Sequence, residues 1–386
     1  MTTRAGTKQR HNVLGTSLRI AILGSRGYPS TYGGFETFVR RLAPWLVSRG
    51  HEVTVYGRSE GRRRVSEIDG IRVVDTVGLS TKSASTVTHG LTAALSCASE
   101  RPDVVLALNV ANGLGLPLLK ARGVPVVMNV DGLEWQRAKW GRLASAGFRL
   151  GAHASARIAD VLVADSREIA RIWTEEFGVD PVFIPYGADV IENVGQSRVT
   201  ALGLTPGSYA LVVARLAPEN NVELFVDAMA QLDWSIPSVV VGSANYDNPL
   251  EGRLRALASA GRLTWLGHVA DQDLLSELWA NAGVYFHGHS VGGTNPALLQ
   301  ALGHGAPTIA VDTVYNREVL ARDDQLVRAD ASAVANAVRE LLDDQPHRVE
   351  LAAAGRNTIT DRYLWESVLS DYEATFASSL ERDARS

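Results

Sequence analysis

A Gly-Gly pair lies where a predicted strand passes into a predicted helix near the start of the chain. The apolar run 18–24 predicts a buried strand, the amphipathic stretch 36–49 predicts a helix, and Gly33-Gly34 lies between them. Glycine amides at a helix N-terminus can approach a phosphate closely, beside the positive end of the helix dipole. The segment therefore indicates an anion-binding loop or, with equal weight, a tight strand-to-helix turn. It has neither the Gly-x-Gly-x-x-Gly spacing of a dinucleotide site nor a Walker-type Gly-Lys-Ser/Thr.

An arginine follows another predicted strand in the second half of the chain. That strand, 209–214, ends just before Arg215, and a helix is expected to begin near Asn220, which is an acceptable N-cap residue. A guanidinium at a strand tip can hold a diphosphate through two parallel hydrogen bonds. The alternative interpretation is a surface arginine at the end of a strand.

A second glycine-rich loop precedes a helix that is expected to start near Asn295-Pro296. Asparagine at the N-cap with proline at the first helical position is a strong start signal, and Gly292-Gly293 lies just before it. Together they predict a second anion-binding cradle. His287 and His289 have no cysteine or acidic third ligand nearby, so no metal site is predicted. His289 either contacts a sugar or phosphate or has a structural role.

Apolar β-branched runs alternate with helical patterns along the chain. The predicted strands are 18–24, 52–56, 71–74, 103–108, 124–129, 160–164, 181–184, 209–214, 237–242, 262–266, 283–287 and 306–311. Helical periodicity is present at 36–49, 84–98, 142–157, 220–231, 271–281, 295–303, 332–343 and 364–380. This alternation is typical of parallel sheets covered by helices on both faces. We expect an α/β protein with two doubly wound, Rossmann-like domains facing across a cleft, where ligands bind beyond the carboxyl ends of the strands.

A stretch rich in glycine and proline at 185–207 divides this pattern, and a length of 386 residues favours two domains. The expected order is a disordered tail at 1–17, a first domain at 18–190, a linker at 191–207, a second domain at 208–363 and a last helical segment at 364–386. The apolar stripe of the last segment predicts a packing face, against the first domain.

The charge of the chain is unevenly distributed. Residues 1–200 hold 25 Lys and Arg against 18 Asp and Glu, a net charge of +7, whereas the remainder holds 13 against 24, a net of −11, and the whole chain has −4. A basic first half favours an anionic partner such as lipid headgroups or a diphosphate. Nucleic acid is disfavoured because no known binding module is recognised. The single cysteine, Cys97, permits no internal disulfide and fits a reducing compartment, and neither a signal peptide nor a spanning segment is expected.

Four blocks of the sequence resemble one protein family. They are SRGYPSTYGGFET at 25–37, DGLEW at 131–135, RLAPENN at 215–221 and GHSVGGTNP at 288–296. Over about residues 18–375 the chain resembles the GT-B glycosyltransferases of family GT4, and more narrowly the bacterial rhamnosyltransferases that carry the first block.

The resemblance implies a hexosyltransferase that takes its sugar from a nucleotide sugar, with retained anomeric configuration and with no required metal or cofactor. The first domain would be the acceptor side and the second would bind the nucleotide sugar. The residues carried over to donor binding are Gly33, Gly34, Arg215, Asn220, Asn221, Gly267, His268, Val269, His289, Gly292, Gly293, Thr294, Asn295 and Gln300. Those carried over to catalysis are Asp131, Glu134 and Glu219, and those on the acceptor side are Tyr32, Phe35, Glu36 and Trp135.

Three positions depart from the pattern of the wider family. Asn220 stands where most relatives have a lysine, so glycine amides would replace one positive charge. Gly292 and Gln300 stand where the wider family has two glutamates, the second of which binds the ribose hydroxyls. Glutamine keeps its hydrogen-bonding capacity without the charge, and a deoxyribose donor such as dTDP-rhamnose lacks one of those hydroxyls. The alternatives are a UDP- or GDP-sugar donor, and a catalytically weakened binding subunit of a polysaccharide assembly complex.

Asp131 follows the predicted strand 124–129, where many relatives have a histidine on the acceptor side. Its carboxylate could accept a hydrogen bond from the attacking hydroxyl and assist its deprotonation, or it could cap the following turn.

Residues 131–160 combine five basic residues with Trp135, Trp140 and Phe148, against three acidic residues. This pattern is typical of contact with anionic lipid, or equally of an ordinary half-buried helix. With the resemblance, it predicts a protein on the cytoplasmic face of the membrane. There it would extend a polyprenyl-diphosphate-linked saccharide for a surface polysaccharide. The sequence predicts no oligomeric state.

Overall fold

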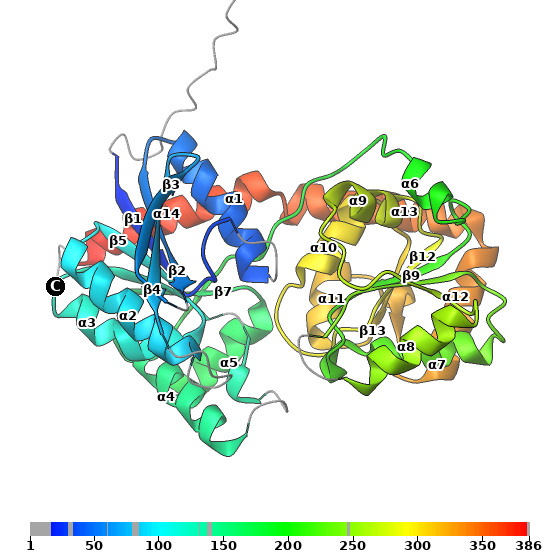
Figure 1. Ribbon diagram of the computed structural model, residues 1–386, viewed down its shortest axis with the longest axis horizontal. Helices are drawn as coiled ribbons and strands as arrows, with labels where there is room; N and C mark the ends of the chain where they lie inside the picture. Colours follow the sequence, from blue (N-terminus) through cyan, green and yellow to red (C-terminus); the bar gives the residue numbers. More distant parts are fainter. Residues whose placement is uncertain are drawn as a thin grey trace, which may run out of the picture. The chain divides into compact units, whose positions relative to one another are not determined.

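A computed structural model describes residues 17–29, 34–59, 61–78, 85–130, 132–136, 141–244 and 248–383. The chain forms two compact units (Figure 1). Unit 1 comprises Met1–Ile184 and Glu366–Ser386, and unit 2 comprises Pro185–Trp365. Of the tail expected at 1–17, only Ser17 is among the described residues, and its hydroxyl donates to the Gly50 carbonyl at 2.7 Å.

Unit 1 is built on an eight-stranded sheet with the order β3-β4-β2-β1-β5-β6-β7-β8. All neighbouring strands are parallel except β3 and β4, which are antiparallel. The strands are β1 (Arg19–Leu23), β2 (Glu52–Ser59), β3 (Arg64–Ile68), β4 (Ile71–Val77), β5 (Val104–Leu108), β6 (Val126–Asn129), β7 (Val161–Ala164) and β8 (Val182–Phe183). The central strands β5, β6 and β7 are buried along their whole length, as expected for a parallel sheet with both faces covered.

The helices of unit 1 are α1 (Gly34–Ser48), α2 (Ser85–Glu100), α3 (Leu116–Lys120), α4 (Arg142–Ile158), α5 (Arg167–Phe177) and α14 (Trp365–Asp383), with short 3₁₀ turns η1 (Val110–Gly115) and η2 (Glu134–Gln136). One face of the sheet is covered by α2, α3 and α4, and the other by α1 and α14 (Figure 1). Local signals set the helix ends. For example, the Ser166 hydroxyl caps α5 by accepting from Ile169 N–H, and Gly178 ends it in the left-handed conformation at φ 67°.

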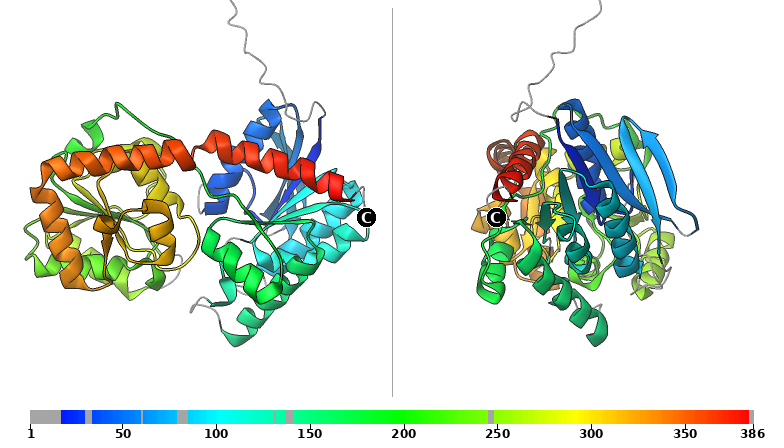
Figure 2. Two further views of the ribbon diagram at one scale, coloured as in Figure 1. Left: turned by 180° about the vertical axis from the view of Figure 1, so that it is seen from behind. Right: turned by 90° about the vertical axis from the view of Figure 1, so that its left-hand side faces the viewer.

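The last helix belongs to unit 1 although it ends the chain (Figure 2). Its Tyr372 ring lies 4.7 Å from the Phe38 ring of α1, and its hydroxyl accepts from the Asn129 side chain at 2.7 Å. Its Glu373 is fully buried and contacts Arg49 and His51 at 3.1 Å and 2.9 Å. The apolar stripe of this helix therefore packs on the sheet of unit 1.

Unit 2 is built on a six-stranded parallel sheet with the order β11-β10-β9-β12-β13-β14. Its strands are β9 (Ala210–Val213), β10 (Ser238–Val241), β11 (Thr264–Trp265), β12 (Val284–His287), β13 (Thr308–Val311) and β14 (Leu326–Val327). Its helices are α6 (Ser197–Ala201), α7 (Val222–Gln231), α8 (Pro249–Ser259), α9 (Gln272–Ala280), α10 (Pro296–Gly303), α11 (Val314–Leu320), α12 (Ala331–Asp343) and α13 (Gln345–Arg362), with 3₁₀ turns η3 (Pro218–Asn220) and η4 (Asp323–Gln325). The pair α7 and α12 covers one face, and α9, α10 and α13 cover the other (Figure 1).

The expected fold class of two doubly wound parallel sheets is confirmed, with differences in detail. The segment 191–207, expected as a linker, lies within unit 2, because Glu277 accepts from the backbone of Arg198 and Asn281 donates to the Gly195 carbonyl. The strands β3 and β14 were not expected, since β3 is an exposed edge strand without an apolar run and β14 has two residues.

The helix expected near residue 220 begins at Val222 instead. A 3₁₀ turn precedes it, and Asn221 adopts the left-handed conformation at φ 51°.

Candidate active site

The strand order of unit 2 reverses between β9 and β12. From β9 the chain proceeds outward to β10 and β11, and it then returns to the other side of β9 as β12. In doubly wound sheets, ligands bind beyond the carboxyl ends of the strands at such a switch point. The two predicted anion-binding loops, 215–221 and 288–296, follow β9 and β12. The fold therefore brings both to the same edge of the sheet.

Hydrogen bonds join these two loops directly. The Asn221 side-chain amide donates to the Gly288 carbonyl at 2.8 Å. Ser290 donates to the Glu219 carbonyl from its backbone at 2.9 Å and from its hydroxyl at 3.0 Å. Gly288 is required for this approach, because a Cβ there would lie 2.4 Å from the Asn220 carbonyl oxygen.

Arg215 is exposed at the tip of β9, and its backbone is held firmly. Its carbonyl accepts from the Ala217 N–H at 2.8 Å and from the Asn220 side-chain amide, also at 2.8 Å. Asn220 is only 2% exposed. Its amide thus positions the arginine loop, and the donor-binding role expected for Asn220 is indirect in this arrangement.

The Glu219 carboxylate has an oxygen with unmet hydrogen-bonding capacity. Its Oε1 is buried, and among the described residues it has no hydrogen-bond partner. A buried polar atom without a partner costs free energy, so such an atom in a loop at the switch point is suited to accept from a ligand hydroxyl.

The second loop leads into α10 as expected. Gly292 has φ 102°, a conformation that favours glycine, and the Asn295 side chain caps α10 by accepting from the Ala297 N–H at 3.0 Å. Thr294, in the loop before α10, is buried, and Gln300, on α10, is half-buried. Gly293 lies between Gly292 and Thr294 and is partly buried.

Two histidines stack at the start of this loop. The rings of His287 and His289 are 4.5 Å apart and inclined by 11°. His287 is fully buried, its Nδ1 lies 3.2 Å from the Tyr285 hydroxyl, and burial lowers its pKa well below 6.5, which keeps the ring neutral near pH 7. The His289 carbonyl accepts from the buried Asn316 side chain at 3.0 Å. These contacts hold the start of the loop.

The segment 267–269 follows β11 at the same edge of the sheet. Gly267 has φ 61°, and its carbonyl accepts from the Gly242 N–H at 2.7 Å. His268 is exposed and Val269 is partly buried. The structure therefore places this predicted donor-binding segment two strands away from Arg215, along one edge of the sheet.

In unit 1 the predicted site residues are only partly described. Tyr32, Gly33 and Asp131 lie outside the described residues. Gly34 begins α1, Phe35 is half-buried, and the buried Glu36 carboxylate lies 4.0 Å from Arg26 Nε.

The loop after β6 is anchored by an aromatic cluster. The Trp135 ring packs edge-on against Trp173 at 6.1 Å and Phe177 at 5.8 Å. Glu134, in the same 3₁₀ turn, is 7% exposed. This packing assigns Trp135 a structural contact with α5, and an acceptor role for it stays a prediction.

Sequence reasoning missed a small pocket at the carboxyl edge of the unit 1 sheet. It lies between the tips of β1 and β2 and the first turns of α2, and its lining includes Ser25, Arg58 and His89. Arg58 follows the predicted strand 52–56 much as Arg215 follows 209–214, so the rule applied to Arg215 would have found it.

Among the described residues, no three His, Cys, Asp or Glu side chains lie close enough to hold a metal ion. Nor, within those same ranges, is there a helix with the length and apolarity needed to cross a bilayer.

Two family models match the chain, one in each half of the sequence. Residues 32–191 match the family model described as Glycosyltransferase Family 4, and residues 204–358 match the one described as Glycosyl transferases group 1. The chain therefore carries two glycosyltransferase domains, the first of family 4 type.

One curated relative of this glycosyltransferase is the GDP-mannose-dependent monoacylated α-(1-6)-phosphatidylinositol monomannoside mannosyltransferase of Corynebacterium glutamicum. It is 29% identical over 231 residues, which are 54% of this chain and 59% of the relative. The chain spans about half the length of the curated relatives that it matches.

Solved structures share the fold of this glycosyltransferase over nearly its whole length. Sucrose-phosphate synthase from Thermosynechococcus elongatus superposes with a TM-score of 0.77 at 19% identity, covering 93% of this chain and 99% of that one. HepE of Anabaena, in complex with UDP and glucose, superposes with a TM-score of 0.76 at 16% identity, covering 94% and 100%. At these identities the likeness concerns the GT-B fold alone.

Proposed function

We propose that this protein is a retaining hexosyltransferase that moves L-rhamnose from dTDP-rhamnose onto a polyprenyl-diphosphate-linked saccharide, in the synthesis of a surface polysaccharide. The observation that carries nucleotide-sugar transfer is the paired arrangement of two loops at the β9–β12 switch point. There an exposed arginine, an unsatisfied carboxylate oxygen and a glycine-rich helix start lie on segments bonded to each other.

Unit 2 binds the donor in this proposal. The Arg215 guanidinium and the amides before α10 hold the diphosphate, because both place positive charge or N–H groups where phosphate oxygens need them. Glu219 accepts from a sugar hydroxyl through its buried Oε1. The segment 267–269 contacts the base, and Gln300 contacts the deoxyribose. Asn220 and Asn221 position these loops through their side-chain amides.

The rhamnosyl specificity rests on the blocks at 25–37, 131–135, 215–221 and 288–296, and on Gln300 in place of a glutamate. A neutral amide matches a deoxyribose, which presents fewer hydroxyls to hold. Family resemblance supports retention of configuration and independence from divalent metal. Turnover that is unchanged after treatment with EDTA would support the latter.

Unit 1 binds the acceptor in this proposal, and α4 contacts the membrane. The exposed positions of α4 fall on one side of the helix at 142, 146, 149, 150 and 157. Three of them are arginines, and Leu150 is 60% exposed. The helix has no acidic residue, so this side is suited to the cytoplasmic, anionic face of a membrane.

A second candidate donor is GDP-mannose. The curated relative from Corynebacterium glutamicum is a GDP-mannose-dependent mannosyltransferase that acts on a phosphatidylinositol mannoside. A UDP-sugar is a third candidate donor. A catalytically weakened binding subunit would show no turnover with any of the three donors, so measured turnover would exclude that role.

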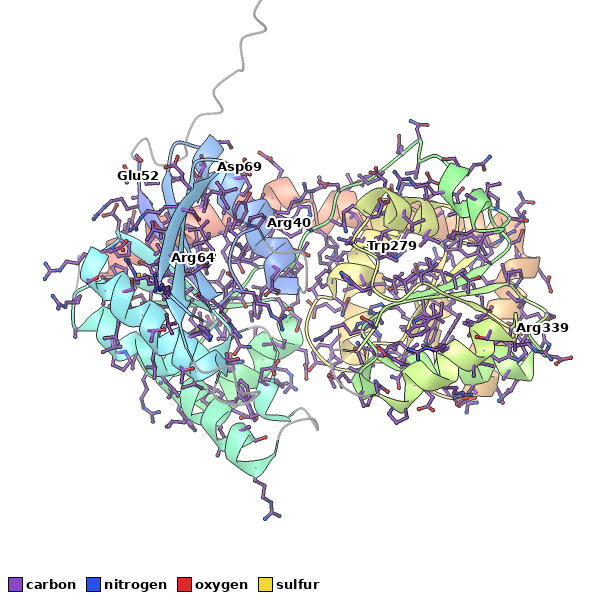
Figure 3. All side chains as sticks on the ribbon, viewed as in Figure 1. Arg40, Glu52, Arg64, Asp69, Trp279 and Arg339 are labelled. Atoms are coloured by element: carbon purple, nitrogen blue, oxygen red, sulfur yellow. The ribbon has the colours of Figure 1, made fainter. Side chains whose placement is uncertain are left out.

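A donor panel tests the proposal. The full chain is assayed for sugar release and transfer with dTDP-, GDP- and UDP-sugars, and nucleotide binding is measured by calorimetry. Arg215→Gln should weaken nucleoside diphosphate binding about 10- to 100-fold, the range of a charge-assisted hydrogen bond. Arg339→Gln, a matched change on the exposed face of α12 (Figure 3), should leave it unchanged. Turnover with GDP-mannose but not dTDP-rhamnose would replace the proposed donor.

A further inference from the structure

The described residues that line the small pocket of unit 1 include none of those that the proposed function assigns to the donor. It is bordered by Gly24 and Ser25 after β1, by Gly57 and Arg58 in β2, and by the first turns of α2. The neighbouring strands β1 and β2 are parallel, so the pocket lies beyond their carboxyl ends. This is the edge at which doubly wound sheets bind ligands.

Arg58 is the residue that makes this pocket unusual. Its Nε is buried, and it has no hydrogen-bond partner among the described residues. A buried guanidinium N–H without an acceptor costs free energy. Buried polar atoms of native proteins nearly always have a partner, so an orphan N–H beside a pocket indicates that an acceptor binds there.

Charged side chains of both signs lie around Arg58. Its backbone N–H donates to the Arg26 carbonyl at 3.5 Å, and the Arg26 guanidinium lies near enough to act on it. Burial, and then the charge of Arg26, lower the pKa of Arg58, and Glu36 acts in the opposite direction. Glu36 lies 4.0 Å from Arg26. The Asp75 carboxylate lies beside Gly57 of the pocket wall, so two guanidiniums and two carboxylates lie near the pocket. The feature that favours an anion is therefore the orphan Nε–H of Arg58.

The other walls of the pocket would allow a ligand to approach the backbone closely. A Cβ on Gly24 would lie 2.2 Å from the Leu108 carbonyl oxygen, and a Cβ on Gly57 would lie 2.4 Å from Asp75 Oδ1. Both positions therefore require glycine, and backbone atoms of Gly24 and Gly57 form this part of the pocket wall. The His89 ring is fixed at one side, since its Nδ1–H donates to the Thr76 carbonyl at 3.0 Å. Ser25 adds a hydroxyl to the lining.

We propose that this pocket binds a phosphoryl group of the acceptor, with Arg58 as the group that contacts a phosphoryl oxygen. The inference rests on the proposed function, in which unit 2 holds the donor diphosphate and the acceptor carries a diphosphate of its own. Phosphate oxygens satisfy a guanidinium better than a neutral carbonyl does, because the hydrogen bond is charge-assisted. The pocket accordingly distinguishes diphosphate-linked acceptors from uncharged saccharides.

Binding of geranyl diphosphate, inorganic pyrophosphate and geraniol to the full chain tests the proposal. The measurements use the Arg215→Gln background, which weakens the donor site, and calorimetry gives the dissociation constants. Adding Arg58→Gln should weaken geranyl diphosphate binding about 10- to 100-fold. Arg58→Lys, which keeps the charge, should retain part of the affinity. The control Arg64→Gln, on the exposed edge strand β3 (Figure 3), should change it less than about twofold.

The outcomes separate the possible ligands. Loss for geranyl diphosphate alone indicates a lipid-linked phosphoryl group, and equal loss for pyrophosphate indicates recognition of phosphate from any source; both support the pocket. Unchanged binding of both in a variant with an unchanged unfolding midpoint overturns it.

The donor site gives the remaining test. In protein that retains Arg215, a second result is decisive: Arg58→Gln weakens the binding of a nucleoside diphosphate but not that of geranyl diphosphate. This result would assign the pocket to the donor and would also overturn the inference. By contrast, a donor panel without turnover or nucleotide binding would contradict the proposed function of unit 2, whereas the binding of geranyl diphosphate decides on the pocket.

Discussion

Ser290 donates two hydrogen bonds to the carbonyl oxygen of Glu219, from its N–H at 2.9 Å and from its hydroxyl at 3.0 Å. The two residues are 71 positions apart in the chain. The backbone of Glu219 is therefore fixed from the neighbouring loop, whereas its Oε1 is buried without a partner among the described residues. A carboxylate so positioned is pre-organised to accept from a ligand.

Glu219→Gln should lower kcat about 100-fold and change the donor dissociation constant less than threefold, because the amide keeps the shape of the side chain but not its charge. Steady-state kinetics and calorimetry measure the two quantities. Glu223→Gln, an exposed change on α7, is the control. A variant as active as the wild type would show that the carboxylate takes no part in transfer.

Asp131→Asn should reduce transfer by about 10²- to 10⁴-fold while donor binding is retained, since a general base contributes on this scale. Single-turnover transfer and donor binding are compared in the same preparation. Unchanged turnover would remove Asp131 from the mechanism and support the alternative that it caps a turn.

The arginines at 142, 149 and 157 on α4 should supply the membrane contact. Changing all three to glutamine should reduce flotation with anionic vesicles at low salt about 100-fold, at about 1 kcal/mol for each basic residue. A matched set on unit 2, Arg255, Arg328 and Arg339 changed to glutamine, should float like the wild type. Wild-type protein that does not associate with these vesicles would contradict the proposal.

Glu373→Gln should destabilise unit 1 by about 3 kcal/mol. Glu373 is fully buried, and Leu18 N–H donates to His51 Nδ1, so the ring proton sits on Nε2 and is donated to Glu373. Removing the carboxylate leaves Arg49 as a largely buried charge without its partner, and such losses cost about 3–5 kcal/mol. Urea unfolding measures the difference. Glu381→Gln, near the exposed end of the same helix, should have little effect.

Unit 2 should lose stability as the pH falls below about 6.5. The pKa of His287 is lowered in the folded protein, chiefly by burial and then by His289, so below this pH the unfolded chain binds more protons than the folded one. The loss is at most about 1.4 kcal/mol per pH unit for one group. Above pH 6.5 His287 does not change the free energy of unfolding with pH. Urea unfolding between pH 5 and 7.5 should show a flatter profile for His287→Gln, and parallel profiles would contradict this account.

Local pattern in the sequence predicted much of the local structure around the two loops of unit 2. Arg215 at a strand tip and Asn295 at a helix start are properties of a few consecutive residues, and the structure places them as expected. The alternation of apolar runs with helical periods also predicted both doubly wound sheets, because residues buried on two faces must be apolar.

Tertiary packing adds contacts that local pattern could not predict. Asn220 is turned toward the Arg215 carbonyl, and Trp135 packs on α5, because each has a neighbour that the sequence does not reveal. The orphan Nε of Arg58 likewise depends on which groups surround the tip of β2.

The sequence by itself determined most of the strands, many of the helices and the positions of the glycine-rich loops, since hydrogen bonds within a turn or a helix end depend on adjacent residues. Only the tertiary structure decided which loops meet. Asn221 reaches Gly288 across 67 residues, and His51 reaches Glu373 across 322. Such pairs form because sheet order and helix packing bring distant segments together, and no short stretch of sequence carries that information.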